Sequence, residues 1–250
     1  AGEAVVIEEF MEGEEASVLC FTDGNTIVPM ISAQDHKRIS DGDMGANTGG
    51  MGAYAPAPVM TKELDKIVYD TILLPAVKAM KKEGCPFKGC LYAGLMITKD
   101  GPKVVEFNCR FGDPETEAVL PLLESDLAKI MLACTKGTLK KEKVEWKNAC
   151  AVDVVLASEG YPATHSSGEE IVGLEEAKKT GCLVFHAGSM KKKGRYVVNG
   201  GRVLNVAAVA PTLKEARDKA YEGVSKISWR GMQYRHDIAD KGLKRLKKRK

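Results

Sequence analysis

Residues 104–115 read VVEFNCRFGDPE, and the rest of the predicted fold is arranged around them. Residues 104–107 combine β-branched and aromatic side chains, a composition that predicts a strand. Because successive side chains of a strand point to opposite faces, Glu106 and Asn108 are expected to share one face. Neighbouring oxygen donors suit a hard cation such as Mg²⁺, which takes one or two protein carboxylates and completes its shell with water and phosphate oxygens. The spacing therefore indicates a metal-binding pair near a strand end.

Further polar groups follow this pair. Arg110 continues on the same face if the strand does, and a planar guanidinium can grip a phosphate or a carboxylate through two parallel hydrogen bonds. Residues 113–115, Asp-Pro-Glu, are expected to leave the strand and to open a helix. Taken singly, each of these residues is better explained as a polar group that faces water. Taken together at this spacing, they favour a binding site.

The composition is that of an ordinary globular chain of one or two domains. The 250 residues are 44% hydrophobic and 28% charged, and no apolar run approaches the roughly 18 residues that span a bilayer. Seven cysteines without a C-x-x-C pair predict reduced thiols of a cytoplasmic protein. The first residues, AGEAV, show no signal peptide and no initiating Met, which suggests a chain that begins within a longer protein.

Charge is distributed unevenly along the chain. The net charge is +3, and residues 241–250 hold seven Lys and Arg without an acid, so the remainder carries 3 − 7 = −4. A role in nucleic-acid binding would therefore depend on this basic tail alone. A solvated, frayed chain end is the simpler interpretation of the tail.

The first part of the chain predicts mostly strands. Residues 5–11 are expected to form a strand, and residues 16–22 and 26–30 a hairpin over Asp-Gly-Asn at 23–25. Residues 32–58 contain several glycines and few large apolar side chains, which predicts a long loop. A loop of this length inside a compact domain is usually functional or disordered.

Two long helices and a second hairpin are expected next. Helical spacing predicts a helix over residues 61–83, capped by Thr61 and kinked or split at Pro75. A hairpin of residues 91–98 and 103–107 leads to a helix over residues 115–135, bent near Pro121. The second hairpin strand carries the polar pair Glu106 and Asn108.

The composition becomes polar and rich in lysine at residues 138–148, where a domain boundary is expected. Beyond it, residues 150–157 predict a strand, and residues 195–198 and 203–209 predict a hairpin over Asn-Gly-Gly. A capping box at the start of residues 212–227 predicts an amphipathic helix.

Residues 7–15, IEEFMEGEE, form a second stretch with binding chemistry. Backbone groups left free where a strand ends can pair with the edge of an adenine, and the Glu15 carboxylate can accept hydrogen bonds from both ribose hydroxyls. Many exposed acidic strand ends have this composition, so without further support the stretch is better explained as a solvated strand end.

The third stretch is the glycine-rich segment 41–53, DGDMGANTGGMGA. Glycines allow successive backbone N–H groups to converge on an anion, although no G-K-[ST] follows as it would in a P-loop. Residues 35–38, DHKR, add positive charge suited to phosphate. The alternatives are a flexible surface loop and, for His36, a packing or surface residue.

These segments together resemble the phosphoribosylamine–glycine ligase (glycinamide ribonucleotide synthetase) family. The resemblance covers nearly all of residues 4–240 and is carried most specifically by QDHKR, NTGGMGAY and EFNCRFGDPE in this order. In animals, this enzyme forms the first part of a trifunctional purine-synthesis protein.

The resemblance implies an ATP-grasp fold of the α+β class. It implies that residues 1–137 are the C-terminal half of an ATP-grasp module, an antiparallel sheet with helices. A linker, 138–147, a small mixed α/β C-terminal domain, 148–240, and the basic tail, 241–250, follow. The family's N-terminal Rossmann-like domain and first ATP-grasp subdomain are missing, so this chain alone is expected to be inactive.

The implied reaction is ATP-dependent. Glycine's carboxylate attacks the γ-phosphate to give glycyl phosphate, and the amine of 5-phosphoribosylamine then displaces phosphate. The implied cofactors are ATP and Mg²⁺ or Mn²⁺. The implied partners are glycine, 5-phosphoribosylamine and the missing N-terminal part of the same enzyme, with no membrane and no nucleic acid.

The resemblance also assigns roles to individual residues. The metal ligands are Glu106 and Asn108. The residues that face substrate or the transferring phosphoryl group are Arg110, Lys37, Asp113 and Asp35. The nucleotide-binding residues are Glu8, Glu9, Phe10 and Met11 as an adenine hinge, Glu15 on the ribose and Asn47 against phosphate.

Two other functions remain open at this point. One is a different ATP-grasp carboxylate–amine ligase, which substrate profiling would distinguish. The other is a non-enzymatic module whose basic tail binds nucleic acid, with an affinity that would fall steeply with salt. The DHKR and NTGGMGAY runs favour the first family over both.

Overall fold

Four antiparallel strands form a first sheet in the order β2–β1–β7–β8. They are β1 (Glu14–Thr22), β2 (Ile27–Pro29), β7 (Gly89–Thr98) and β8 (Gly101–Asn108). This arrangement comes from a computed structural model, which describes residues 5–248. The hairpin between β7 and β8 carries the polar pair as predicted, and the hairpin between β1 and β2 turns at residues 23–25 as predicted.

Helices cover both faces of the first sheet. Alternate residues of β1, such as Val18 and Cys20, pack against α1 (Lys62–Val68) and α2 (Leu74–Lys82). The residues between them, such as Leu19, pack on the opposite side with the helices that follow β8. The two core clusters explain why β1 is buried almost throughout its length.

The predicted helix 61–83 is confirmed with a break inside it. Thr61 caps the first turn, since its hydroxyl accepts a hydrogen bond from the Leu64 N–H at 3.2 Å. A π-helical turn, Tyr69–Leu73, separates α1 from α2 and ends just before Pro75. Proline lacks an N–H and its ring clashes with the preceding turn, so a widened turn before it is expected.

The prediction of one bent helix over residues 115–135 is wrong. The segment contains α3 (Glu115–Val119), a 3₁₀ turn (Leu120–Leu122) and, after a non-helical break, α4 (Leu127–Lys136). Pro121 cannot donate a helical hydrogen bond. Asp126 then starts a new helix, because its carboxylate accepts hydrogen bonds from the N–H groups of Ala128 and Lys129.

The predicted strand over residues 5–11 is also wrong. Residues 5–13 are extended but pair with no strand among the described residues, and the apolar side chains of Val5, Ile7 and Phe10 are exposed. β-branched residues favour a strand only when a neighbouring strand supplies hydrogen bonds and packing. Pairing with β7 begins at Glu14.

The glycine-rich region is more regular than the predicted loop. It contains β3 (Gln34–Asp35), β4 (Arg38–Ser40), β5 (Met44–Asn47) and β6 (Gly52–Ala55). Strands β4 and β5 pair with each other, and a short 3₁₀ turn, Asp41–Asp43, joins them. Residues 38–47 are called the glycine hairpin below.

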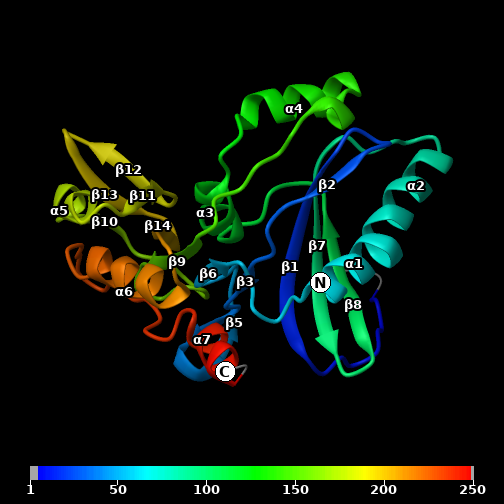
Figure 1. The fold of residues 1–250 in the computed structure, drawn as a ribbon. Helices are drawn as coiled ribbons and strands as arrows, with labels where there is room; N and C mark the ends of the chain where they lie inside the picture. The colour runs from blue at the N-terminus through cyan, green and yellow to red at the C-terminus, as the bar shows by residue number, and fades with distance from the viewer. Residues whose placement is uncertain (1–4, 249–250) are drawn as a thin grey trace.

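A second sheet has the order β11–β14–β9–β6–β3. Its later strands are β9 (Cys150–Ala157), β11 (Leu183–His186) and β14 (Arg202–Ala210), and α6 (Leu213–Val224) packs on them. Strand β9 pairs with β6, so this sheet contains strands from both sides of the expected boundary at 138–147. Helix α3 contacts β6 and β9 and lies between the two sheets (Figure 1).

The predicted hairpin of residues 195–198 and 203–209 is wrong. Strand β13 (Arg195–Asn199) pairs with β10 (Ser167–Glu170) and β12 (Ser189–Lys192), whereas β14 belongs to the second sheet. Lys193 and Gly194 both have positive φ, which is the geometry of a tight two-residue hairpin turn between β12 and β13. This turn, rather than Asn-Gly-Gly, forms the hairpin.

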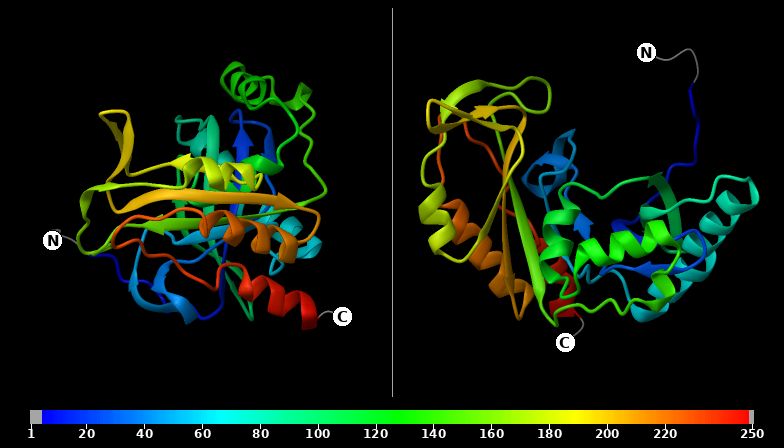
Figure 2. Two further views of the ribbon diagram at one scale, coloured as in Figure 1. Left: turned by 90° about the vertical axis from the view of Figure 1, so that its left-hand side faces the viewer. Right: turned by 90° about the horizontal axis from the view of Figure 1, so that it is seen from above.

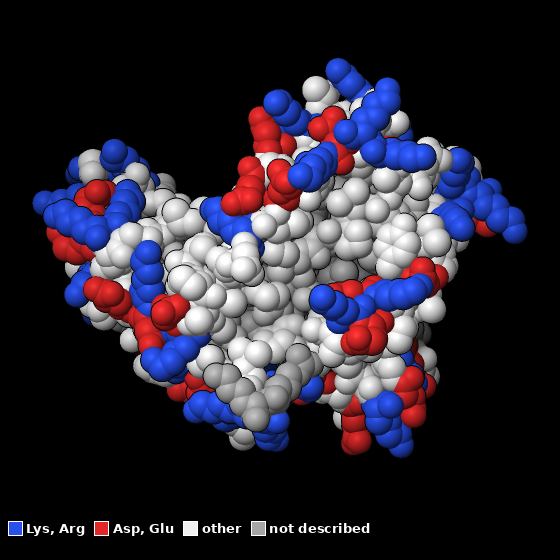
Figure 3. Space-filling view, viewed as in Figure 1, with Lys and Arg blue, Asp and Glu red and all other residues white. Residues whose placement is uncertain are grey.

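The molecule has two lobes. Seen from above, the second sheet with α6 forms one lobe, and the first sheet with α1 and α2 forms the other (Figure 2). Charged side chains gather on the outer parts of both lobes, while the surface between them is largely uncharged on the face shown in Figure 3. The mixture of helices and antiparallel sheets confirms the predicted α+β class.

The basic tail is a packed helix and not a frayed end over its described length. Helix α7 (Asp240–Lys248) forms ion pairs from Lys241 to Asp43 and from Arg245 to Glu14. Tertiary ion pairs, which the local composition does not reveal, hold it in place. Residues 249–250 of the predicted tail lie outside the described residues.

Two further expectations can be compared with the structure. All seven cysteines are free, in agreement with the predicted reduced thiols. Among the described residues, every helix is too short or too polar to cross a membrane.

Replacing Gly173 by alanine is expected to lower the free energy of unfolding by about 3 kcal/mol or more. Gly173 precedes α5 (Leu174–Lys179) with φ +86°, and an added Cβ would lie 1.8 Å from the Lys226 carbonyl oxygen. Urea unfolding measures the effect. The matched control is Gly84→Ala, with φ +80° and open space around it, which should lose only about 1 kcal/mol. Equal losses would contradict the proposed clash.

Candidate functional site

A cleft of about 250 Å³ opens between the first sheet and the glycine hairpin. Strands β1, β7 and β8 supply one wall, and residues from β3 to the end of the glycine hairpin supply the other. The polar residues that line it are Glu15, Ser17, Asp35, Lys37, Asn47, Thr48, Tyr92 and Glu106. The cleft therefore collects residues from all three stretches singled out in the sequence.

Strand register places the first wall's side chains on one face. Ser17 of β1 lies opposite Gly94 of β7, and Gly94 lies opposite Glu106 of β8. Tyr92 lies opposite Asn108 in the same way. A Cβ on Gly94 would lie 3.3 Å from Cγ of Glu106, so the glycine leaves room for the carboxylate to lie over the sheet.

Glu106 and Asn108 share one face of β8, as their spacing predicts. The amide nitrogen of Asn108 donates a hydrogen bond to Oε1 of Glu106 at 2.9 Å. Among the described residues, no three His, Cys, Asp or Glu side chains converge to hold a metal. A cation at this pair would therefore take most of its ligands from water or a bound phosphate, a pattern that fits Mg²⁺.

The second wall brings a cation to the cleft. Lys37 Nζ lies 2.7 Å from Oδ2 of the buried Asp35. Burial opposes the charged form of Lys37, but the carboxylates of Asp35 and Glu115 outweigh it and raise the lysine pKa. Lys37 is therefore a cation at neutral pH. Thr48 fixes the backbone beside it, because its N–H and hydroxyl both donate to the Lys37 carbonyl, at 2.7 and 2.9 Å.

Glu115 is a buried acidic residue that the sequence did not single out as a site residue. Its Oε1 accepts hydrogen bonds from the Ser17 hydroxyl at 2.8 Å and from the Tyr92 hydroxyl at 2.9 Å. These three residues come from α3, β1 and β7. The available signal was its place as the last residue of the central stretch 104–115, directly after Asp113 and Pro114.

Arg110 and Asp113 lie beyond the strand end. Strand β8 stops at Asn108, so Arg110 does not continue on the face of the pair, and its guanidinium donates to the Phe111 carbonyl at 2.9 Å. Asp113 forms an ion pair with Arg202 at 3.0 Å. Within residues 5–248, the lining of the cleft includes neither Arg110 nor Asp113.

Arg202 is a second residue that the sequence did not single out, and no sequence signal marks it. Its Nη1 also donates to the carbonyl oxygens of Gly49 and Asp113, both at 2.9 Å. Strand β14 thereby ties the end of the glycine-rich segment to the start of α3.

The predicted nucleotide-binding residues fall into two groups. Glu15 and Asn47 line the cleft together with Glu106. Residues 8–10 are exposed and Met11 is half-buried, and none of the four pairs with a strand among the described residues. Glu9 forms an ion pair with Lys103. Residues 9–11 line a separate hollow of about 490 Å³ beside the β7–β8 turn.

His36 is a packing residue, in line with the simpler interpretation. It is 1% exposed, and its Nδ1 lies 3.1 Å from the Gly52 carbonyl oxygen. Burial and then the charges of Arg235 and Lys241 lower its pKa to about 4, so the imidazole is neutral at pH 7. It carries no charge to the cleft.

The antiparallel sheet between helices, and a cleft that faces it with a glycine-rich hairpin, define the chain as part of an ATP-grasp protein. A family model described as "Phosphoribosylglycinamide synthetase, ATP-grasp (A) domain" matches residues 1–116. The model of the C domain of the same synthetase matches residues 151–241. The chain belongs to the phosphoribosylglycinamide synthetase family.

Individual relatives agree with this assignment. The chain is 54% identical over 244 residues to "Trifunctional purine biosynthetic protein adenosine-3" of Gallus gallus, covering 97% of this chain and 24% of that protein. It is 52% identical over 249 residues to "Phosphoribosylamine--glycine ligase, chloroplastic" of Arabidopsis thaliana, covering 98% and 47%. The chain thus spans about a quarter to a half of the length of these relatives.

A solved structure shares the whole arrangement. The crystal structure of phosphoribosylamine–glycine ligase from Thermotoga maritima superimposes with a TM-score of 0.82 at 40% identity, covering 93% of this chain and 57% of that one. The predicted family and ATP-grasp fold are therefore confirmed.

Proposed function

We propose that this chain carries the metal and nucleotide site of a ligase that joins glycine to 5-phosphoribosylamine with ATP. The observation that carries the proposal is the meeting, in one cleft, of Glu106 with Lys37 and Asn47 of the opposite wall. Relatives at 54% and 52% identity bear names from purine biosynthesis and from this ligation.

The proposed chemistry sets an electrostatic problem that these residues can meet. A carboxylate of glycine must approach the γ-phosphate of ATP, and both are anions. The bond from the γ-phosphorus to ADP breaks as the bond to the glycine oxygen forms. The ammonium of Lys37, held by Asp35 at 2.7 Å, would offset the negative charge that gathers there.

Glu106 and Asn108 would hold Mg²⁺ or Mn²⁺. When bound, such an ion neutralises phosphate charge and orients the triphosphate. One carboxylate and one amide suit an ion that draws its other ligands from phosphate and water. Glu15 would accept the ribose hydroxyls, and Asn47 would lie against phosphate.

The second half of the reaction needs an amine close to the acyl phosphate. The amine nitrogen attacks the glycyl carbonyl carbon, the carbon–oxygen bond to phosphate breaks, and the amine loses a proton. Arg110, with Lys37, is proposed to face the transferring phosphoryl group or the acyl phosphate, and Asp113 and Asp35 are proposed to orient the substrate amine or ribose. The proposed adenine hinge is residues 8–11, whose backbone groups are unpaired in the described structure.

The proposed division of the chain follows the family. Residues 1–137 are assigned to the ATP-grasp part, 138–147 to a linker and 148–240 to the C-terminal domain, followed by the basic tail, 241–250. The relatives are longer than this chain. We propose that their additional region completes the active site, so the activity belongs to the full-length polypeptide.

The test is formation of ADP by the full-length polypeptide that includes this chain. ADP should form only when glycine and 5-phosphoribosylamine are both present with Mg²⁺ and ATP. Other amino acids and other amines serve as the control panel. Turnover with a different carboxylate–amine pair, and none with these substrates, would replace this function by that of another ATP-grasp ligase.

A further inference from the structure

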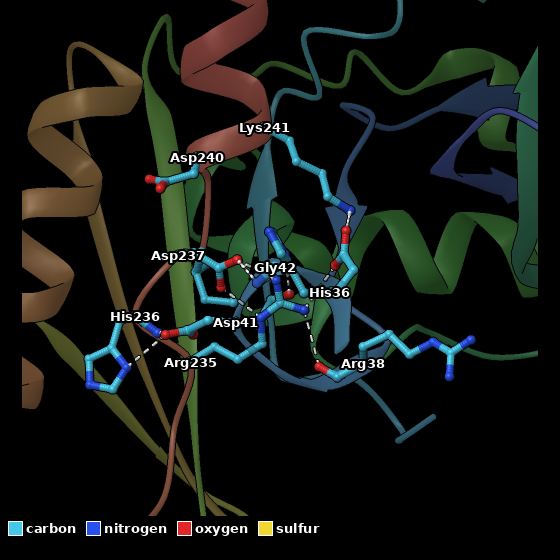
Figure 4. A network of polar contacts seen from close by, with 12 residues as sticks. His36, Arg38, Asp41, Gly42, Arg235, His236, Asp237, Asp240 and Lys241 are labelled. Atoms are coloured by element: carbon cyan, nitrogen blue, oxygen red, sulfur yellow. Dashed lines mark hydrogen bonds and ion pairs between the residues drawn. The ribbon is translucent and has the colours of Figure 1, made fainter. Parts of the chain in front are cut away.

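A segment near the C-terminus holds the tip of the glycine hairpin. Residues 235–241, called the clasp segment below, contact residues 38–43, which lie almost 200 positions earlier in the chain. Figure 4 shows contacts of this kind between Arg38 at the start of β4, the 3₁₀ turn, and the residues that precede and begin α7. None of the clasp residues belongs to the proposed ligand-binding set.

Arg235 is the centre of this contact. Its side chain is 0% exposed. Nε and Nη2 each donate to one carboxylate oxygen of Asp237 at 2.7 Å, and Nη1 donates to Oδ1 of Asp43 at 3.0 Å and to the Arg38 carbonyl at 3.1 Å. A rigid planar fork suits this set of partners, because one group must bond three residues in fixed directions.

Three further contacts join the same two segments. Oδ2 of Asp237 accepts a hydrogen bond from the Gly42 N–H at 2.8 Å. Oδ1 of Asp41 accepts one from the His236 N–H at 2.7 Å. Lys241 pairs with Asp43. The hairpin tip is therefore fixed at each of its residues from Asp41 to Asp43.

The other end of the glycine hairpin faces the cleft. Arg38 pairs with Asn47 across the β4–β5 ladder, and Asn47 lines the cleft. Lys37 and Thr48, which also line it, flank the hairpin and are bonded to each other through the Thr48 N–H. Arg235 thus contacts the hairpin at its tip, through Asp43, and at its cleft end, through the Arg38 carbonyl.

We propose that Arg235 is a positioning residue for the cleft: it fixes the tip of the glycine hairpin and so sets where Lys37 and Asn47 stand opposite Glu106. The structural part of this inference is independent of the reaction. Its kinetic consequence rests on the proposed ligase function, so the two are tested by separate measurements.

The structural test is hydrogen exchange of Arg235→Lys, which keeps the charge but not the fork. Amides of residues 38–48 should exchange about tenfold faster than in the unchanged protein, while amides of β1 and β7 keep their rates. The matched control is Arg230→Lys, because Arg230 is 87% exposed and lies outside the clasp. Unchanged exchange of the hairpin, or equal acceleration of every element, would overturn the proposal.

The kinetic test uses the same two variants in the full-length polypeptide. Arg235→Lys should raise the KM for ATP about tenfold with a much smaller change in kcat, since a displaced hairpin weakens binding before it alters chemistry. If the hairpin of Arg235→Lys exchanges faster but the KM for ATP is unchanged, the positioning role is rejected. If the polypeptide without substitutions shows no ligase activity, the proposed ligase function is rejected instead. The hydrogen-exchange result still tests the clasp in that case.

A second variant keeps the proposal testable if Arg235→Lys does not fold. Asp43→Asn removes one charged partner of Arg235 and of Lys241 from a partly exposed position. It should accelerate exchange of the same residues by a smaller factor. No local acceleration in this variant, with its fold intact, would count against the clasp in the same way.

Discussion

Replacing Glu106 by glutamine is expected to lower kcat/KM of the full-length polypeptide for the proposed ligation by about a hundredfold or more. The substitution keeps the size of the side chain and removes the charge that would hold the metal. Glu106 is the carboxylate of the polar pair, 2.9 Å from the amide nitrogen of Asn108. A weakened metal site should also need more Mg²⁺ for half-maximal rate, which a titration of the rate against Mg²⁺ measures.

The control for this variant is Glu142→Gln, an exposed glutamate of the lysine-rich connection after α4. It should leave both the rate and the Mg²⁺ dependence unchanged. Asn108→Ala should act in the same direction as Glu106→Gln with a smaller effect, because it removes a neutral ligand. Full activity of Glu106→Gln at ordinary Mg²⁺ would remove the metal assignment.

Replacing Asp153 by asparagine is expected to stabilise the protein, and increasingly so as the pH rises. Asp153 lies in the middle of β9 and is 0% exposed. Within residues 5–248, neither of its carboxylate oxygens has a hydrogen-bond partner. Burial, and then the charges of Glu117 and Asp113, raise the pKa of this carboxyl well above its ordinary value, against the opposing charge of Arg202. The fold therefore favours the protonated form of this carboxyl.

The sign of the pH dependence follows from proton binding. Above about pH 4 the unfolded chain releases this proton and the folded chain retains it, so the group destabilises the fold progressively as the pH rises toward its folded-state pKa. Asparagine cannot ionise and removes this penalty. The stability difference should therefore grow as the pH rises from 5 toward 7, by at most about 1.4 kcal/mol per pH unit.

Urea unfolding of both proteins across this pH range measures the difference. Glu117, whose pKa is raised to about 7 chiefly by burial, contributes with the same sign but is present in both proteins. Asp153→Val supplies a second comparison, since it also cannot ionise and fits a strand position. A difference that stays constant with pH would show that Asp153 is not held protonated by the fold.

Local features of the fold were predictable from the sequence. Turn residues at 23–25 and the caps at Thr61 and Thr212 mark a hairpin and helix starts that the structure contains. These signals act over a few residues, so neighbouring residues suffice to read them. The shared face of Glu106 and Asn108 follows in the same way from the period of a strand.

Features that depend on distant partners were not predictable. The pairing of β9 with β6, the burial of Asp153 and the contact of Arg235 with Asp43 each join residues from distant parts of the chain. The prediction of a strand at residues 5–11 was wrong for the same reason, because a strand-like composition does not reveal whether a partner strand exists.

The candidate site was predictable in part. The polar pair and the glycine-rich segment could be read from the residues, and the resemblance to a family joined them to Lys37, Glu15 and Asn47. Their meeting in one cleft required the structure. Glu115 and Arg202 were missed because their partners, Ser17 and Tyr92 in one case and Gly49 in the other, come together only through the packing of α3 and β14.

The most direct test of the metal and nucleotide site is anomalous diffraction from crystals of the full-length polypeptide grown with Mn²⁺ and ATP. The account predicts a manganese peak within coordination distance of the Glu106 carboxylate, with the nucleotide phosphates on the side of the glycine hairpin. A manganese peak bound to the same phosphates but held by other protein groups, with Glu106 turned away from it, would contradict the account.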